Sequence, residues 1–234
     1  MYHSHVLEHF SKEDGVKLMQ ECFRVLKPGG IIRIVVPDLE RIARGYLDCL
    51  SVCLENPGDK KAQRNYEWML LEMYDQTVRN SSGGEMLKYL SREHIENEDF
   101  VFQRIGEEGQ AIRRQILNNR LHDVSRGVLD KRKHPMLRQY LGKFKGLVKR
   151  VISRDTSYNK FEQIGRFRLG GEIHQWMYDR HSLRCLLNGI DFEKICIFDA
   201  FTSYLPEWDK YNLDGFESKT RKPDSLFVEA VKPE

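Results

Sequence analysis

The first 38 residues read in order as the end of a strand, a helix and a buried strand. Ser11 can cap the helix, with Asp14 three residues on, and Pro28-Gly29-Gly30 can end it. The apolar face of this helix recurs at helical intervals, at Val16, Met19, Phe23 and Leu26. Residues 31–36 are a β-branched run interrupted only by Arg33, which is typical of a parallel strand covered on both faces. The pattern predicts a β-α-β unit and therefore an α/β fold.

Helical patterns dominate the middle of the chain. Helices are expected at 39–54, 60–79 and 96–120, with an open turn at residues 80–84. The second helix should bury a stripe formed by Tyr66, Met69, Leu70 and Met73. We predict that residues 45–169 are a helical insertion in an α/β domain made of residues 1–44 and 170–234.

The chain returns to the sheet after Gly170-Gly171. Asp179 or Ser182 can cap a helix that runs through Leu187 and ends at Gly189. Strands are expected at 192–198 and 225–231, separated by a long polar loop.

Composition excludes several classes of protein. In 234 residues, 40% are hydrophobic and 31% charged, as in soluble globular proteins, and no apolar run approaches the length of a membrane span. The five cysteines are an odd set without a C-x-x-C pair, which favours reduced, buried thiols over a disulfide framework. With no signal sequence at the N-terminus, we expect a cytoplasmic protein.

Positive charge is concentrated within the predicted insertion. Residues 113–150 hold twelve Lys or Arg residues against two acids, Asp123 and Asp130, although the whole chain carries only +3. The later part adds an apolar stripe, at Leu137, Tyr140, Leu141, Phe144, Leu147, Val148 and Val151. Such a helix either packs its stripe on the domain or lies on an anionic surface, such as the inner face of a membrane. Nucleic acid is not expected as a partner.

Two stretches carry a family resemblance as well as a pattern. "SHVLEHF…RVLKPGG-IIRIVVPD" resembles the second half of a class I S-adenosylmethionine-dependent methyltransferase domain, through its fifth strand. "HQWMYDRHSL…LLNGIDFEKI…RKPDSLFVEAVKP" resembles the end of the same family, in particular bacterial type 11-like methyltransferases associated with surface-polysaccharide pathways. The resemblance covers residues 2–45 and 170–233.

The resemblance implies a fold and a cofactor. The expected fold is the C-terminal part of a Rossmann-like methyltransferase sheet with a large helical insertion, the last strand lying antiparallel between its predecessor and the fifth strand. In the family, a strand and a G-x-G-x-G loop that bind S-adenosylmethionine precede this region, whereas this sequence begins after it. We therefore expect a longer reading frame, a separate N-terminal complementing chain, or self-association through the exposed strand edge.

The first group of candidate site residues follows strand ends. Ligands of open α/β sheets bind beyond the carboxyl ends of the parallel strands. One set contains Ser4 and His5, expected to contact the cofactor, with His5 also a candidate catalytic residue; the substrate-binding candidates are Glu8, Pro37 and Asp38.

Glu8 has two interpretations. His5, Glu8 and His9 have a spacing similar to the E-x-x-E-H metal motif of small-RNA 2′-O-methyltransferases, with His5 in place of the first glutamate. The alternative, which we expect, is no metal: Glu8 and His9 orient the loop and cap the following helix.

The second group lies near Glu172, before the predicted helix at 179–187. His174 and Asp179 are candidate catalytic residues, because proton removal needs a base with a pKa near neutrality. Trp176 and Tyr178 are candidate substrate-binding residues that could form a wall for a sugar ring, or simply core aromatics.

Two functions remain open. One is methyl transfer from S-adenosylmethionine to an oxygen or nitrogen of a sugar-like or envelope-linked substrate. The other is a non-catalytic, methyltransferase-like module that binds a partner or a membrane surface.

Overall fold

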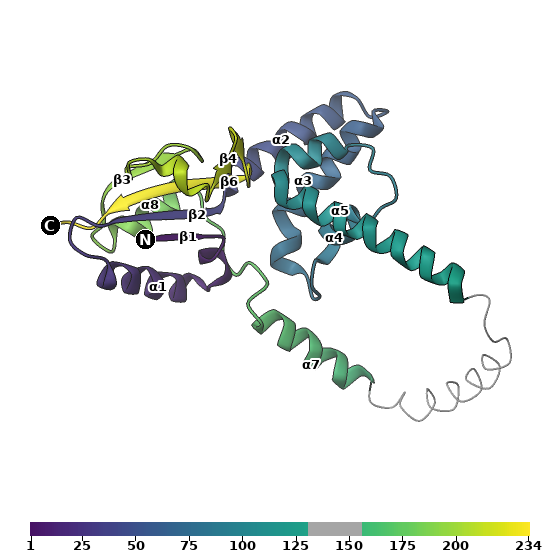
Figure 1. Ribbon diagram of the computed structural model, residues 1–234, viewed down its shortest axis with the longest axis horizontal. Coiled ribbons are helices and arrows are strands. Elements are labelled where there is room, and N and C mark those ends of the chain that lie inside the picture. The colour runs from purple at the N-terminus through teal and green to yellow at the C-terminus, as the bar shows by residue number, and fades with distance from the viewer. Residues whose placement is uncertain (131–155) are drawn as a thin grey trace.

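A four-stranded mixed sheet organises the structure, a computed structural model that describes residues 1–130 and 156–234 (Figure 1). Its strand order is β1-β2-β6-β3. β1 (Tyr2–Ser4) is parallel to β2 (Ile31–Pro37), and β6 (Ser225–Val231) is antiparallel to both β2 and β3 (Glu193–Phe198). The predicted position of the last strand is confirmed.

Helices cover one face of this sheet. Ser11 caps α1 (Lys12–Val25) by accepting a hydrogen bond from the Asp14 backbone N–H, as predicted. Asp179 and Ser182 together form a capping box on α8 (Arg180–Asn188). The two helices pack on the alternate residues of β2 and β6 that point to their side. The buried residues of this core include Leu7, Met19, Ile32, Ile34, Val36, Leu183, Leu187, Leu226, Val228 and Ala230.

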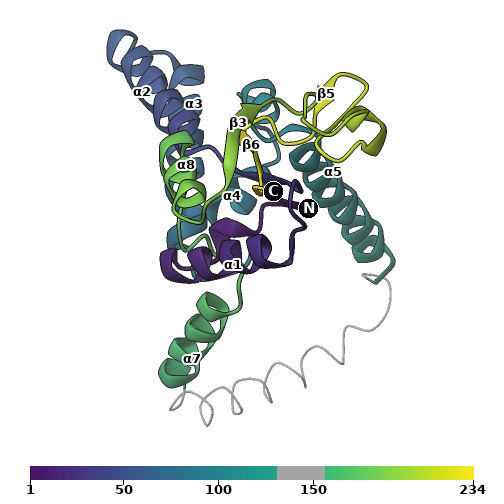
Figure 2. The ribbon, with the colours of Figure 1, turned by 90° about the vertical axis from the view of Figure 1, so that its left-hand side faces the viewer.

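The loop before β6 covers the opposite face, as Figure 2 shows from the end of the sheet. It was expected to be simply polar, but it contains η2 (Trp208–Tyr211) and a small hairpin of β4 (Gly215–Phe216) and β5 (Lys219–Thr220). Arg33, only 2% exposed, lies beneath it. Its guanidinium donates to Asp214 at 2.6 Å and to Glu229 at 2.8 Å, so the single polar residue of the β2 sequence is buried in an ion cluster.

The helical part forms a second core beyond the end of the sheet (Figure 1). This core is formed by α2 (Leu39–Glu55), α3 (Lys60–Val78), α4 (Gly84–Leu90) and α5 (Glu98–Asp130), whereas α7 (Thr156–Leu169) lies apart from it. The predicted buried stripe of α3 is wrong in part. Met69 is buried, but Tyr66, Leu70 and Met73 are half-buried, and Trp68 fills the centre, donating its indole N–H to Glu72.

Helix α4 and a break in α5 were not predicted from the sequence. The predicted open turn ends in helix α4, whose first N–H groups, of Glu85 and Met86, are held by the buried carboxylate of Asp75. α5 is broken at Gly106, which has φ +63° and ψ −151°. A Cβ there would lie 2.4 Å from the Arg221 carbonyl oxygen, so glycine allows the loop before β6 to approach the helix.

The predicted basic surface needs a correction at its start. Arg113 is 4% exposed and donates to the carbonyls of Leu90, Arg92 and Glu93, because the end of α4 and the turn after it leave these acceptors unpaired. Its charge is therefore used inside the fold. The apolar stripe at 137–151, and with it the predicted membrane-binding face, lies outside the described residues.

Two further expectations can be compared with the structure. Within the described ranges, no helix is both long and apolar enough to cross a membrane. All five cysteines are free thiols, as predicted, but they are not uniformly buried: Cys22 is buried, whereas Cys185 is exposed on α8.

Candidate active site

The carboxyl ends of β1 and β2 and the beginning of β6 meet at the edge of the sheet that faces the helical part. Asp38 follows β2, and its backbone N–H donates to the carbonyl of Asp224, which precedes β6. A cavity of about 240 Å³ lies between this edge and α3, α4 and α5. Its polar lining comprises His5, Gln76, Arg79, Glu108, Lys222 and Asp224, and its apolar lining Met86, Leu87, Leu90, Ile105 and Ile112.

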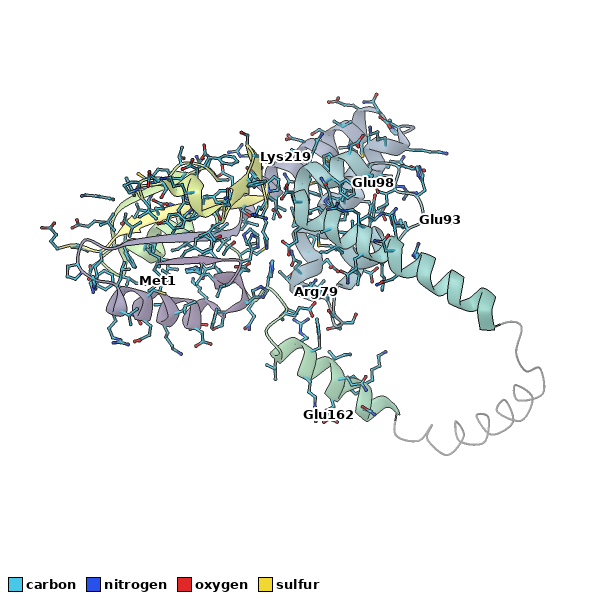
Figure 3. The ribbon with its side chains drawn as sticks, in the orientation of Figure 1. Met1, Arg79, Glu93, Glu98, Glu162 and Lys219 are labelled. Carbon is cyan, nitrogen blue, oxygen red and sulfur yellow. The ribbon has the colours of Figure 1, made fainter. Side chains whose placement is uncertain are left out.

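Charged groups of both signs face this cavity. Lys222 pairs with Glu108 at 2.9 Å. Arg79 is labelled in Figure 3 at the end of α3, and its guanidinium donates a hydrogen bond to the Glu172 carbonyl. Its buried Nε has no hydrogen-bond partner within the described ranges. Burial raises the pKa of Asp224 despite the opposing charges of His5 and Arg104. An apolar wall with several separate polar groups suits a small ligand that carries hydroxyl groups.

His5 connects the cavity to a buried carboxylate. The residue has φ +53°, an uncommon conformation outside glycine, and its backbone N–H donates to the Val35 carbonyl. Its Nε2 lies 2.9 Å from Ser225 Oγ, and its Nδ1 lies 3.2 Å from Glu8 Oε1. The imidazole is thus held between a hydroxyl and a carboxylate at the cavity wall.

Glu8 lies in η1 (Leu7–His9) and has no exposed surface. Neither carboxylate oxygen accepts a hydrogen bond of normal geometry from the described part of the chain. Burial acts to raise the pKa of Glu8, but the contact with His5 and its charge outweigh burial, so the net pKa is lowered. The structure therefore holds a buried carboxylate whose nearest partners are imidazoles.

The segment before α8 packs directly on η1. The Glu8 carbonyl accepts hydrogen bonds from the backbone N–H groups of Gln175 and Trp176, and Gln175 also donates to the His9 carbonyl. His174 is 5% exposed, and burial lowers its pKa to about 4. Its ring meets that of His9 edge to face, with centroids 4.9 Å apart. The two predicted groups of site residues, far apart in sequence, are brought together here.

Because the segment before α8 packs on η1, the possible metal ligands in the structure differ from the predicted set of His5, Glu8 and His9. The ligand atoms of Glu8, His9 and His174 all lie within 4.8 Å of one another, with His174 in the place that the sequence interpretation gave to His5.

Four other predicted site residues have structural roles at the strand ends and in helix caps. Asp179 is the N-cap of α8, and the hydrogen bond from the Ser182 backbone N–H lowers its pKa, so its carboxylate is engaged in capping. Asp38 caps α2 in the same way, although burial raises its pKa. Ser4 ends β1 half-buried, and Pro37 is buried at the end of β2. The cavity described above is not lined by any of these four residues.

The two aromatic candidates separate. Tyr178 is 3% exposed in the core under the sheet, where burial and the charge of Glu8 raise its pKa to about 12. Trp176 is 40% exposed, and Lys12 lies over its ring, on the α1 side. These two residues therefore do not form a shared wall for a sugar ring.

Sequence reasoning missed most of the cavity lining. Asp224 could have been found, because a strand antiparallel to its neighbours begins where they end, so the residue before it shares the ligand-binding edge. Arg79 and Glu108 carry no comparable signal, since their positions depend on how α3 and α5 pack.

The comparisons with known proteins give one match. Residues 1–34 match the family model described as Methyltransferase domain, a stretch that spans β1, η1, α1 and the beginning of β2. No curated protein and no solved structure matches significantly. The match supports a methyltransferase-like character for the part of the chain that contains His5, Glu8 and His9.

Proposed function

We propose that this chain forms the acceptor side of a methyltransferase site, for methyl transfer from S-adenosylmethionine to an oxygen or nitrogen of a sugar-like or envelope-linked substrate. The observation that carries the proposal is the cavity at the carboxyl ends of β1 and β2, lined by His5 directly after the strand that begins the family match. Its volume of about 240 Å³ suits a single sugar-sized group rather than a large ligand.

The described residues do not fit the whole cofactor. The amino-acid end of such a nucleoside cofactor normally lies against a glycine-rich turn that opens from a strand into a helix. No strand in residues 1–130 or 156–234 does so: β1 leads into η1 through His5, and β2 into α2 through Asp38. We therefore assign only the acceptor side to this chain and derive no step through the cofactor.

His5 is the residue best placed to handle the proton of an acceptor hydroxyl. When the acceptor oxygen gains a methyl group, its proton must leave, and an imidazole at the cavity wall can accept it. Glu8 beside Nδ1 orients the ring and stabilises the imidazolium that results. His174 and Asp179, the other catalytic candidates, do not line this cavity.

Exchange of His5 for glutamine should therefore reduce methyl transfer by about 100-fold or more, within the usual contribution of a general base. The tagged protein would be isolated from its natural host, so that any further segment or partner accompanies it. The measurement is incorporation of radiolabelled methyl from S-adenosylmethionine into the host's envelope carbohydrate.

The matched control is His94→Gln, at an exposed position away from the cavity, which should keep the parental rate. Equal labelling by the parent and His5→Gln would remove His5 from the mechanism. Carbohydrate labelling that does not depend on the tagged protein would contradict methyl transfer itself and favour the non-catalytic binding module.

A further inference from the structure

We propose that Glu8, His9 and His174 bind one zinc ion. Their ligand atoms lie within 4.8 Å of one another, and the set offers one carboxylate and two imidazoles. Three such ligands with water in the fourth position are a common zinc environment in proteins. The proposal concerns binding alone and does not depend on methyl transfer.

The state of Glu8 is the independent observation in favour of an ion. Its side chain is 0% exposed, and neither carboxylate oxygen has a hydrogen bond of normal geometry from the described residues. His5 Nδ1 lies 3.2 Å from Oε1, which leaves Oε2 unpartnered, and a buried carboxylate in this state is costly unless a further cation compensates its charge. A zinc ion between Glu8 and the two imidazoles would supply that charge.

His9 has its ligand atom available. Its Nδ1 lies 3.1 Å from the Ile173 carbonyl oxygen, which can only accept, so Nδ1 carries the proton. Nε2 is then left with a free lone pair, and this atom lies 3.9 Å from Glu8 Oε1. A hydrogen bond from the second ring nitrogen to a backbone carbonyl is how proteins commonly orient a metal-binding histidine.

The backbone holds the third ligand in place. His174 donates its backbone N–H to the Gln76 carbonyl, and the next two residues donate theirs to the Glu8 carbonyl. Ligand pairs in a tetrahedral zinc site are roughly 3.4 Å apart, given metal–ligand bonds of about 2.1 Å. Small side-chain rotations therefore close the set, without movement of the two segments.

The ion would join two distant parts of the chain. Glu8 and His9 directly follow β1, whereas His174 lies in the segment that returns from the helical part to α8. His5, whose Nδ1 contacts the same carboxylate, would act as a positioning residue that links the zinc site to the cavity wall.

The test uses the full chain, stripped of metal with a chelator and then dialysed against zinc, manganese or magnesium. We expect one zinc per chain by elemental analysis and a rise in melting temperature of roughly 5 °C at a hundredfold excess over the dissociation constant. Cobalt(II) should give the visible absorption of a four-coordinate site. Glu8→Gln and His9→Gln should each lose the bound zinc, the thermal shift and the cobalt spectrum.

An alternative zinc ligand pair provides the matched control. His181 Nε2 and Cys185 Sγ lie 3.6 Å apart on the outer surface of α8 and could bind zinc adventitiously. The double variant His181→Gln, Cys185→Ser should keep the stoichiometry and the thermal shift. Zinc retained in both Glu8→Gln and His9→Gln, or no zinc bound by the parent, would overturn the proposal. If Glu8→Gln does not fold, His9→Gln decides, because the His9 side chain is 26% exposed and its exchange leaves the core filled.

Discussion

Replacement of Arg33 by methionine is expected to lower the free energy of unfolding by about 3–5 kcal/mol, the usual cost of removing one partner from a buried ion cluster. Arg33 is 2% exposed and lies between the carboxylates of Asp214 and Glu229. Methionine fills similar volume but leaves both carboxylates buried without their cation. The loop that covers this face of the sheet should loosen with it, because Arg33 also donates to the loop carbonyls of Asp199 and Thr202. Urea denaturation followed by circular dichroism measures the change.

Arg24→Met is the matched control for this prediction. Arg24 pairs with Glu21 at 2.8 Å, but both side chains are more than 60% exposed. Its loss should change stability by less than about 0.5 kcal/mol. If the two variants were equally stable, the cluster beneath the loop would not hold the fold together.

Acidification of the metal-free protein should destabilise it strongly between pH 6.5 and pH 4. Burial lowers the pKa of His3 and of His174 from 6.5 to about 4. Between these values the unfolded chain binds protons that the folded chain does not, so stability falls as the pH falls. Each histidine contributes about 3 kcal/mol, which is fully present above pH 6.5 and lost at about pH 4.

His3→Asn isolates one of these contributions. Both ring nitrogens of His3 are buried without a hydrogen-bond partner in the described part of the chain, and burial outweighs the attraction of Glu8 for a charged imidazole. The fall in unfolding free energy from pH 7 to pH 4, measured with chelator present, should be about 3 kcal/mol smaller in the variant. The exposed His94→Asn serves as the control. An identical fall in His3→Asn and the parent would show that folding does not lower the pKa of His3.

The sheet and its helices could be predicted from the sequence because their signals are local. Ser11 caps the first helix as predicted, and of the two alternatives Asp179 and Ser182, Asp179 is the N-cap while Ser182 completes its capping box. The last strand, residues 225–231, has the predicted bounds. Helix α4 was missed because its first turn depends on Asp75, which belongs to the preceding helix.

The candidate site was less predictable because it depends on contacts between distant residues. The predicted strand ends directed attention to His5, and the structure places this residue in the cavity lining. Periodicity, however, cannot reveal that residues 173–176 pack on η1 and bring His174 to Glu8. Arg33 illustrates the same limit: a polar residue in an apolar strand signals burial of a charge, but its partners, Asp214 and Glu229, are about 180 to 200 residues away.

Calorimetric titration of S-adenosylmethionine into the 234-residue chain tests most directly whether it carries the acceptor side of the site alone. The account predicts no saturable heat at cofactor concentrations on the order of tens of micromolar, because no strand of the described residues opens into a helix through a glycine-rich turn. A cooperative thermal transition of the same sample shows that the chain is folded. Stoichiometric binding of the cofactor would contradict the account, since it would place a complete cofactor site within these residues.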